Sequence, residues 1–547
     1  MEMSVPPPPP REAVGPLVRG VAVLRELAAA GGRSTAVELV RATGLARSTV
    51  DRVVSTLERV GHLRAEGREV VLTPRVMELG NAYLTASGLP DLLGPHADRL
   101  AGELDESVSL AVPDGERVRF VHQATRRRRM SLAFRIGDAL PAERGAPGAL
   151  FAADWSEEQW ARHSADLAGG DVPPLPPAPP EATASFEARV RAARSAGWSE
   201  DDQLIEAGLI ALAMPVRDAA GRQVCAVAVV SHTSRHSVAS LRRAVLPRLR
   251  ETVTAMERTL ATAPPRDAGD AAGATTAGWT RATKRELGPG FVESLARGLA
   301  VLTVFGQGHA ALPLTTLAEA AGLPRATARR ALITFEHLGY VAHDGRLYRP
   351  TARLLELGYP QLSGVTLPRI AQPHLAALAA RVHDSASMAV LDGDDIRYVA
   401  RVPTVRIMTV NITVGTRFPA YATAMGRVLL AGLPAAERAA RLGGTALPAL
   451  TPHTVTDPAR LATVLDRAAN DGFALADEEL EEGLRSIAVP VRDRAGRTVA
   501  AVNVSMHASR RGPGQAREEL LPPLRETAAR IEADLHVAAR HAPVALE

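Results

Sequence analysis

The spacing of apolar residues over 322–340 predicts an α-helix with one buried face. Apolar side chains recur three and four residues apart, at Ala328, Ala331, Leu332, Phe335 and Leu338. Arg325 and Arg329 share a different face, because four residues make about one helical turn. Thr327 and Arg330 lie beside them. The predicted helix therefore has a buried side and a basic, hydroxyl-bearing first turn.

The flanking segments predict a helix-turn-helix with a wing. A short helix, Thr315–Ala321, precedes the turn residue Gly322. Two short strands follow around Asp344-Gly345, a pair of residues that favours a hairpin turn. In this geometry the second helix can enter a major groove with its first turn at the base edges. Taken alone, the window also suits an ordinary amphipathic helix with solvated arginines.

A repeat of the whole pattern favours the DNA-binding interpretation. Val-Arg-Gly-Val-Ala-Val-Leu at 18–24 matches Ala-Arg-Gly-Leu-Ala-Val-Leu at 296–302, which places Gly20 against Gly298 at a shift of 278 residues. Further along, Pro-Val-Arg-Asp at Pro215 matches the same four residues at Pro490, a shift of 275. The chain is therefore a tandem duplication, and its first copy has a recognition helix of its own at 47–60.

The remaining segments mix helices with strands on tight hairpins, which predicts an α+β fold. Proline, glycine and alanine mark two segments without a regular pattern. We expect, in order, a disordered proline-rich arm (1–16), a first winged helix-turn-helix (17–73), a connecting helix (74–88), a first effector-type domain (89–263), a linker (264–290), a second winged helix-turn-helix (291–350), a connecting helix (351–366) and a second effector-binding domain (367–539).

Composition excludes several classes of protein. The chain has 547 residues, 46% of them hydrophobic and 23% charged, as in soluble globular proteins with several cores. A net charge of +4 is small for this length, so a nucleic-acid surface must be local. No apolar run is long enough for a membrane span, and a single cysteine, Cys225, excludes an internal disulfide framework. We expect a cytoplasmic protein that does not bind a membrane.

Enzymatic motifs are missing from the sequence. There is no phosphate-binding Gly-x-x-x-x-Gly-Lys loop, no His-Glu-x-x-His zinc motif and no cysteine with a plausible catalytic partner. The acidic run at 477–482 has the composition of a solvated turn. We therefore expect no catalytic residues, no metal and no cofactor.

Five segments of the second copy together resemble the IclR family of bacterial transcriptional regulators: 291–302, Gly-Leu-Pro-Arg-Ala-Thr-Ala-Arg-Arg at 322–330, 392–402, Ala-Thr-Ala-Met-Gly-Arg-Val-Leu-Leu at 422–430 and 480–491. They are most similar to the branch that controls aromatic-acid catabolism, the protocatechuate and 4-hydroxybenzoate regulators. The resemblance implies two copies of a winged helix-turn-helix domain followed by a GAF-like effector-binding domain with an antiparallel sheet. It also implies that subunits pair through their DNA-binding units. The first copy is similar but more diverged, and two complete units in one chain depart from the usual family plan.

As candidate contacts to double-stranded DNA we select the outward residues of the two recognition helices. Arginine can donate two hydrogen bonds to guanine, and serine and threonine can hydrogen-bond to bases or phosphates. They are Arg47, Ser48, Thr49, Arg52, Arg325, Thr327, Arg329 and Arg330. Asp51 stands where the second copy has Arg329, so we expect the two helices to read different halves of a pseudo-palindromic operator. One chain would then form an intrachain pseudo-dimer, alone or within a further homodimer.

The resemblance places the ligand site on two strands and one loop-to-helix turn of the second copy. The strand at 502–507 alternates polar residues onto one face. A small aromatic acid such as 4-hydroxybenzoate or protocatechuate would bind there; the alternative is a set of satisfied polar groups near a sheet edge. The candidate residues are Thr423, Ala424, Met425, Asp477, Arg485, Ser486, Asn503, Ser505 and His507.

The first copy lacks the polar strand residues. Ala211, Ala228 and Val230 stand where the second copy has serine, asparagine and serine. A buried site without hydrogen-bonding partners holds a polar acid poorly. We therefore expect the second domain to sense the ligand and the first to be mainly structural.

The sequence predicts a transcriptional regulator whose ligand shifts the DNA-binding geometry, in either the repressing or the activating direction. Two alternatives remain open: an effector domain that processes its ligand chemically, or winged helices that bind proteins in place of DNA.

Overall fold

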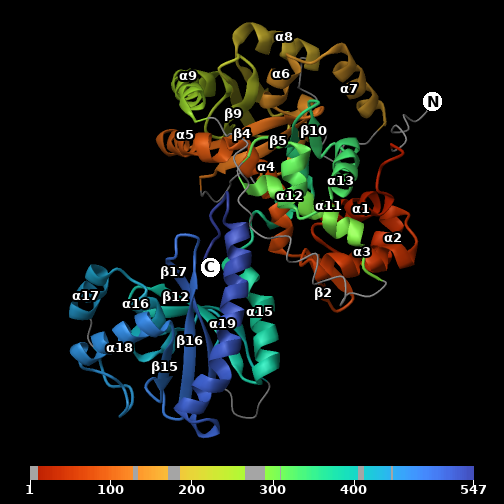
Figure 1. Cartoon of the computed structure of the whole chain (residues 1–547). Coiled ribbons are helices and arrows are strands. Elements are labelled where there is room, and N and C mark those ends of the chain that lie inside the picture. Colours follow the sequence, from red (N-terminus) through yellow and green to blue (C-terminus); the bar gives the residue numbers. More distant parts are fainter. Residues whose placement is uncertain are drawn as a thin grey trace. The chain divides into compact units, whose positions relative to one another are not determined.

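The computed structural model describes residues 10–126, 134–169, 185–264, 290–307, 309–404, 412–444 and 447–547. The chain divides into two compact units, Met1–Ser363 and Gly364–Glu547 (Figure 1). Most of the predicted arm (1–16) and linker (264–290) falls outside the described residues. No helix in the described part of the chain combines the length and apolar character that a membrane crossing requires.

The first winged helix lies at the start of the first unit. Thr35 begins its second helix with a capping box, in which the Thr35 hydroxyl accepts from the Glu38 N–H while the Glu38 carboxylate accepts from the Thr35 N–H. Gly44 makes the turn with a positive φ of 66°. The elements are α1 (Gly15–Ala29), β1 (Arg33–Thr35), α2 (Ala36–Thr43), α3 (Arg47–Arg59), β2 (Leu63–Glu66) and β3 (Glu69–Leu72), with the strands ordered β1-β3-β2.

The second winged helix repeats this order within the same unit. Gly322 makes the equivalent turn with a φ of 62°. A two-stranded wing takes the place of the three-stranded sheet, and Leu312 joins it through an isolated bridge to Tyr348. The elements are α11 (Glu293–Thr303), η3 (Val304–Gln307), α12 (Leu314–Ala320), α13 (Arg325–His337), β10 (Val341–His343) and β11 (Tyr348–Pro350).

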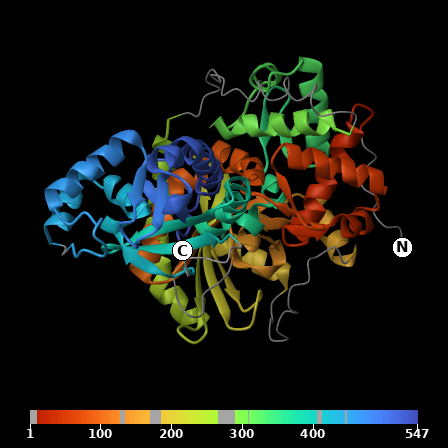
Figure 2. The same cartoon turned by 90° about the horizontal axis from the view of Figure 1, so that it is seen from below.

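The two winged helices share one hydrophobic core, in which α1 and α11 lie side by side (Figures 1 and 2). The contact is reciprocal. A Cβ atom on Gly20 would lie 2.4 Å from the nearest side-chain carbon of Leu295, and one on Gly298 would lie 2.7 Å from Leu17. Each glycine therefore receives the leucine of the other copy, and the two helices approach closely because neither glycine has a side chain.

Two hydrogen bonds cross between the copies in the same reciprocal way. The Val14 N–H donates to the Thr334 hydroxyl on α13, and the Val292 N–H donates to the Thr56 hydroxyl on α3, both at 2.9 Å. The segment that precedes each copy's first helix is thus held by the recognition helix of the other copy.

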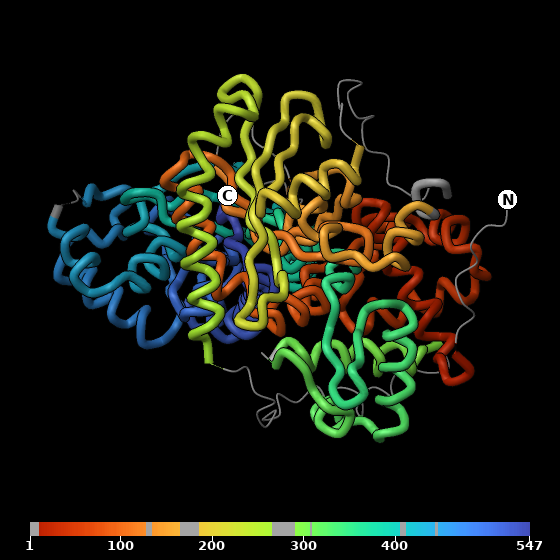
Figure 3. The backbone as a smooth tube through the Cα atoms, turned by 90° about the horizontal axis from the view of Figure 1, so that it is seen from above, coloured from red at the N-terminus to blue at the C-terminus, as the bar shows by residue number. Residues whose placement is uncertain are grey.

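The effector-type domains contain six-stranded antiparallel sheets of matching order, β6-β5-β4-β9-β8-β7 and β14-β13-β12-β17-β16-β15. In the first domain α5 and α9 cover one face, and Figure 3 shows α9 running along β8 and β9. In the second, α15 and α19 occupy one face and α16 and α18 the other (Figure 1). The α+β class with two winged helices and two antiparallel effector-type sheets is confirmed.

The elements of the first domain are α5 (Leu89–Leu104), β4 (Ser107–Asp114), β5 (Arg117–Ala124), β6 (Ala139–Pro141), η2 (Ala142–Arg144), α6 (Ala146–Ala152), α7 (Glu157–Gly169), α8 (Phe186–Ala196), β7 (Ser199–Asp202), β8 (Leu209–Arg217), β9 (Gln223–His232) and α9 (Val238–Thr262).

Those of the second are α15 (Leu367–Val382), β12 (Ser385–Asp392), β13 (Asp395–Val402), β14 (Arg417–Pro419), η5 (Ala420–Ala422), α16 (Ala424–Ala431), α17 (Ala435–Gly444), α18 (Pro458–Asp471), β15 (Ala474–Asp477), β16 (Leu484–Arg492), β17 (Thr498–His507), η6 (Ala508–Arg510) and α19 (Pro513–Ala538).

The connecting segments differ between the copies. The first is η1 (Pro74–Val76) followed by the continuous helix α4 (Met77–Ser87). The second, predicted as a helix over 351–366, is broken into η4 (Ala352–Glu356) and the one-turn α14 (Tyr359–Leu362), with Gly358 between them at φ 114°. Pro360 explains the correction, since a proline inside a helix removes a hydrogen bond and clashes with the preceding turn.

The close crossing of α1 and α11 predicts that Gly20→Val destabilises the first unit. Valine would push a side chain into Leu295, which is fully buried, and overpacking of this kind typically lowers the free energy of unfolding by about 1–3 kcal/mol. Differential scanning calorimetry should show a lower Tm. The matched control is Gly102→Val on α5, where no atom beyond the neighbouring backbone of the same helix lies within 4 Å of the added Cβ. Equal Tm values for Gly20→Val and the control would contradict a close crossing.

Candidate functional site

The first turns of α3 and α13 present exposed side chains, while their opposite faces lie in the shared core. Val50, Val53, Val54 and Leu57 anchor α3, and Ala328, Ala331, Leu332 and Phe335 anchor α13. Thr49 and Thr327 are half-buried. The remaining predicted DNA-contacting residues are exposed: Arg47, Ser48, Arg52, Arg325, Arg329 and Arg330.

Several of these arginines have partners in the free protein. Arg52 donates to the Gly290 carbonyl at 3.5 Å, and Arg330 donates to the Glu12 carbonyl at 3.4 Å, so this pair of contacts is reciprocal. The adjacent positions are not equivalent. Asp51 accepts from Arg47 at 3.1 Å on its own helix, whereas Arg329 forms an ion pair with the Glu12 carboxylate at 2.5 Å.

The two recognition helices therefore offer different charge patterns on matching scaffolds. The first carries a carboxylate beside Arg47, and the second carries an arginine whose partner comes from the other copy's leading segment. Both ion pairs are at least half exposed, so a phosphate or base edge could compete with them.

A cavity of about 320 Å³, its open mouth included, lies between α16 and the sheet of the second unit. Six of the nine predicted ligand residues line it: Thr423, Ala424, Met425, Ser486, Asn503 and Ser505. The sequence reasoning did not select the other lining residues: Tyr398, Ala422, Ala476, Glu479, Leu480 and Leu484.

The polar floor of the cavity comes from two neighbouring strands. Ser486 on β16 lies directly opposite Ser505 on β17 in the antiparallel register. The Asn503 side-chain N–H donates to the Ser505 hydroxyl at 2.8 Å, and only 2% of Asn503 is exposed. No described residue donates a hydrogen bond to Asn503 Oδ1. The floor thus offers two hydroxyls and one unused acceptor.

The wall opposite the floor is the start of α16. The Thr423 hydroxyl accepts from the Gly426 N–H at 3.0 Å and so caps the helix. The first backbone N–H groups of an α-helix have no acceptor within the helix, and they favour an anion at this end. Ala424 and Met425, which begin α16, line the cavity.

Tyr398 closes the apolar side of the cavity. Its ring makes an edge-to-face contact with Phe418, at 5.9 Å between centroids. Burial raises the pKa of Tyr398 to about 12, so the phenol remains protonated at physiological pH.

Glu479 joins the cavity to a buried ion pair that the sequence reasoning missed. Arg427 on α16 donates from both terminal nitrogens to the Glu479 carboxylate, in one case at 2.5 Å, and from Nε to the Tyr421 carbonyl at 2.9 Å. Arg427 is 2% exposed and Glu479 is 8% exposed. The interpretation of 477–482 as a solvated turn is therefore wrong for Glu479.

The other three predicted ligand residues do not line the cavity. Arg485 turns to the opposite face of β16, where it pairs with Asp477 and donates to the Ala508 carbonyl at 2.7 Å. His507 is exposed at the end of β17, within 2.7 Å of the Ser509 hydroxyl. The strand alternation that selected His507 stops being informative at the end of the strand, where the chain turns into η6.

No cluster of three or more His, Cys, Asp or Glu side chains that could hold a metal ion occurs among the described residues. Cys225, the single cysteine of the chain, is buried in β9, and burial raises the pKa of its thiol to about 12.

Comparisons with known proteins find two family models, each matching the chain twice. The model described as "IclR helix-turn-helix domain" matches residues 16–67 and 294–345. The model described as "Bacterial transcriptional regulator IclR C-terminal" matches 81–258 and 360–533, more than half of the chain.

Each of the following relatives matches a stretch of this chain that is about as long as one copy. The Pca regulon regulatory protein of Pseudomonas putida is 42% identical over 235 residues, which cover 43% of this chain and 81% of that protein. The p-hydroxybenzoate hydroxylase transcriptional activator of Acinetobacter baylyi is 36% identical over 44% of this chain and 90% of its own length. The solved inducer-binding domain of the Acinetobacter transcription factor PobR, in complex with 3-hydroxybenzoic acid, is 34% identical over 30% of this chain and 97% of that domain, with a TM-score of 0.29.

Removing one member of the buried ion pair should destabilise the second unit. Arg427→Met leaves the Glu479 carboxylate buried without its cation, which typically lowers the free energy of unfolding by about 3–5 kcal/mol. Calorimetry should show this as a lower Tm. The double variant Arg427→Met/Glu479→Leu, which removes both charges, should recover most of the loss, because the first copy has Ala149 and Leu204 at these positions. A double variant as unstable as the single one would show that the ion pair does not dominate.

Proposed function

The chain belongs to the IclR family of bacterial transcriptional regulators, and we propose that it binds a pseudo-palindromic operator and responds to a small aromatic acid. The observation that carries the proposal is the pairing of two complete recognition helices, α3 and α13, in a single core. It would act in the cytoplasm on genes of aromatic catabolism. The intrachain pair supplies two reading helices, and a further homodimer would supply four.

The DNA site is proposed to have two unequal halves. Arg47, Ser48, Thr49 and Arg52 would read one half, and Arg325, Thr327, Arg329 and Arg330 the other. An aspartate among them can accept a hydrogen bond from cytosine and repels phosphate, whereas an arginine favours guanine or phosphate. Asp51 and Arg329 are therefore the residues that make the two halves differ.

The effector is proposed to bind in the cavity of the second unit. Its carboxylate would lie at the start of α16, near the Ser486 and Ser505 hydroxyls, because these groups can donate hydrogen bonds. A phenolic hydroxyl could donate to Asn503 Oδ1. The names of the two relatives support this class of ligand, since one regulates the Pca regulon and the other activates p-hydroxybenzoate hydroxylase.

Ligand and DNA would be linked by a shift of population. A ligand that binds one arrangement of the effector domain more tightly favours the DNA-binding geometry that accompanies it. Residues 351–366 join the second domain to its winged helix. Within this segment η4 and α14 lie on either side of Gly358. This segment is the proposed route of coupling, and either repression or activation can result.

Asp51→Arg should make the preferred DNA site more symmetric. The change gives α3 the residue that α13 has at Arg329 and removes the partner of Arg47. Selection from a random DNA library, at one fixed salt concentration, should return unequal half-sites for the natural protein and more similar ones for the variant. Glu103→Arg, an equal change of charge at an exposed position of α5, should leave the selected site unchanged. Selection of identical half-sites by the natural protein would refute the proposal that the two recognition helices read different half-sites.

Ser505→Val should weaken effector binding. Isothermal titration with 4-hydroxybenzoate and protocatechuate should give binding to the full-length protein, and loss of the Ser505 hydroxyl should reduce the affinity about tenfold or more. Ser509→Ala, whose hydroxyl contacts His507 outside the cavity, is the control and should bind as the natural protein does. Failure of both acids to bind the natural protein would reject this ligand class and leave the DNA-binding role intact.

A further inference from the structure

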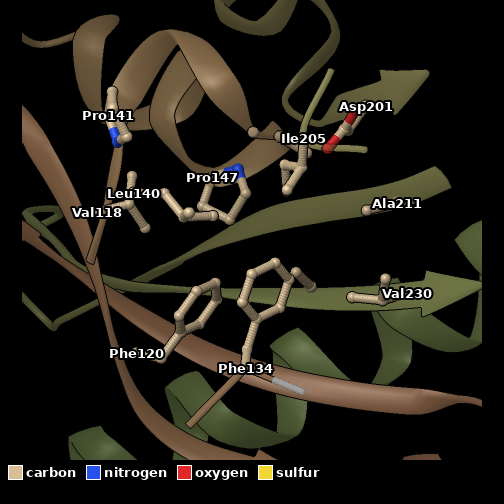
Figure 4. A pocket seen from close by; sticks show the side chains of 13 residues that line it. Val118, Phe120, Phe134, Leu140, Pro141, Pro147, Asp201, Ile205, Ala211 and Val230 are labelled. Carbon is tan, nitrogen blue, oxygen red and sulfur yellow. The ribbon is translucent and has the colours of Figure 1, made fainter. Parts of the chain in front are cut away.

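The first effector-type domain contains a cavity at the position that corresponds to the one in the second unit. It lies between α6, the end of β7 and the sheet, and its space, with the solvent at the open mouth counted, is about 380 Å³. Figure 4 shows Phe120 and Phe134 on one side, with Pro147 and Ile205 facing them and Asp201 beside Ile205. Nine of its thirteen lining positions match positions that line the second cavity, at the shifts of 278 and 275 residues, whereas Val118, Phe134, Leu140 and Pro141 have no counterpart in that lining.

The polar and apolar positions of the two cavities are exchanged. Ser486, Asn503 and Ser505 of the second cavity become Ala211, Ala228 and Val230 in the first, as the sequence indicated. The structure adds the reverse exchange, because the apolar Ala476 becomes Asp201. The first cavity is therefore not merely a version of the second without polar groups; it has one polar group in a different place.

Asp201 is fully buried and only partly satisfied. Its Oδ1 accepts from the Leu204 N–H at 2.7 Å, and its Oδ2 accepts no hydrogen bond from any described residue. Burial raises the pKa of this carboxyl to about 7, against the smaller opposing effects of the Leu204 hydrogen bond, Arg189 and Arg144; Asp202 adds to the rise. An unused acceptor thus lines an otherwise apolar cavity.

The walls are suited to a flat ring. Phe120 and Phe134 stack at 4.9 Å between centroids with 22° between their planes. At the start of α6, Pro147 takes the position of Met425 and so removes one of the N–H groups that the second cavity presents. A carboxylate here would meet fewer helix N–H donors and would compete with Asp201 for the nearby positive charges of Arg189 and Arg144.

We propose that the first effector-type domain is a second ligand site, and that it binds a single-ring aromatic compound that carries a hydroxyl donor and no carboxylate. The ring lies against Phe120 and Phe134, and the hydroxyl donates to Asp201 Oδ2. The site is separate from the effector site of the second unit and does not depend on the ligand assigned there. A ligand site here departs from the expectation of a mainly structural first domain, which followed from the loss of the polar groups that would hold an acid.

The test uses two compounds that differ at one substituent: p-cresol, a phenol with a methyl group, and 4-hydroxybenzoate, which has a carboxylate in its place. Isothermal titration of the full-length protein with p-cresol should show binding that is weakened about tenfold or more by Asp201→Ala. This variant is expected to fold, because the second copy has Ala476 at the same position. The same binding should be unchanged in Ser505→Val, which alters only the second cavity.

A second variant tests the cavity without altering the carboxyl. Ile205→Trp fills the space beside Asp201 from a half-exposed position and should also weaken p-cresol binding. The reciprocal variant Ala476→Asp should weaken binding of 4-hydroxybenzoate by placing a carboxyl in the second cavity. The proposal is overturned if p-cresol does not bind at millimolar concentration, if Asp201→Ala and Ile205→Trp leave its affinity unchanged, or if Ser505→Val removes its binding.

Discussion

The close crossing of α1 and α11 is the contact on which the two-headed DNA-binding unit depends. Gly20 and Gly298 each accept the leucine of the other copy, and the leading segments donate across to Thr334 and Thr56. Because both halves belong to one chain, pairing is an intramolecular event whose effective concentration does not fall on dilution. Two subunits of identical sequence must present the same residues to both half-sites. A duplicated chain is free of that restriction, and the difference between Asp51 and Arg329 uses this freedom without disturbing the crossing.

The same duplication makes the connecting segments unequal. Gly80 lies inside α4 with the ring of Tyr359 against it, so that an added Cβ would lie 2.4 Å from the ring, and the Tyr359 hydroxyl donates to Asn81 at 3.2 Å. Glu356, in the broken second connector, accepts from Tyr340 at 2.6 Å and lies 3.7 Å from Arg119. Arg119 occupies the position on β5 between Val118 and Phe120, which line the first cavity. A ligand that moved β5 would therefore act, through Arg119 and Glu356, on Tyr340, which follows the turn at the end of α13. This gives the first domain a physical route to the second recognition helix.

The sequence predicted what periodicity and repetition determine, and missed what depends on tertiary partners. The buried faces of α3 and α13 and the polar side of β17 follow from spacing alone. The break in the second connecting segment does not follow from spacing. Both copies contain Glu-Leu-Gly at this point, and only the later Pro360 distinguishes the second copy from the first. Arg485 and Ser486 are neighbours on one strand, so the alternation that places Ser486 in the cavity necessarily places Arg485 outside it. Asp201 was missed because Ser-Glu-Asp-Asp at 199–202 has the composition of a solvated loop, whereas it forms the edge strand β7, which buries alternate residues.

The two cavities place a buried carboxyl in different surroundings: Glu479 has an arginine partner, and Asp201 does not form such an ion pair among the described residues. In the second, Arg427 provides a buried cation within hydrogen-bonding distance of Glu479. In the first, Ala149 and Leu204 replace that pair, and burial instead favours protonation of Asp201. A carboxyl at position 476 would lie three residues from Glu479 and face a second negative charge in the same cavity. A carboxylate ligand in the first cavity would compete with Asp201 for the positive charges of Arg189 and Arg144. Each arrangement thus favours one class of ligand and opposes the other, so divergence of the first copy would change its specificity without abolishing binding.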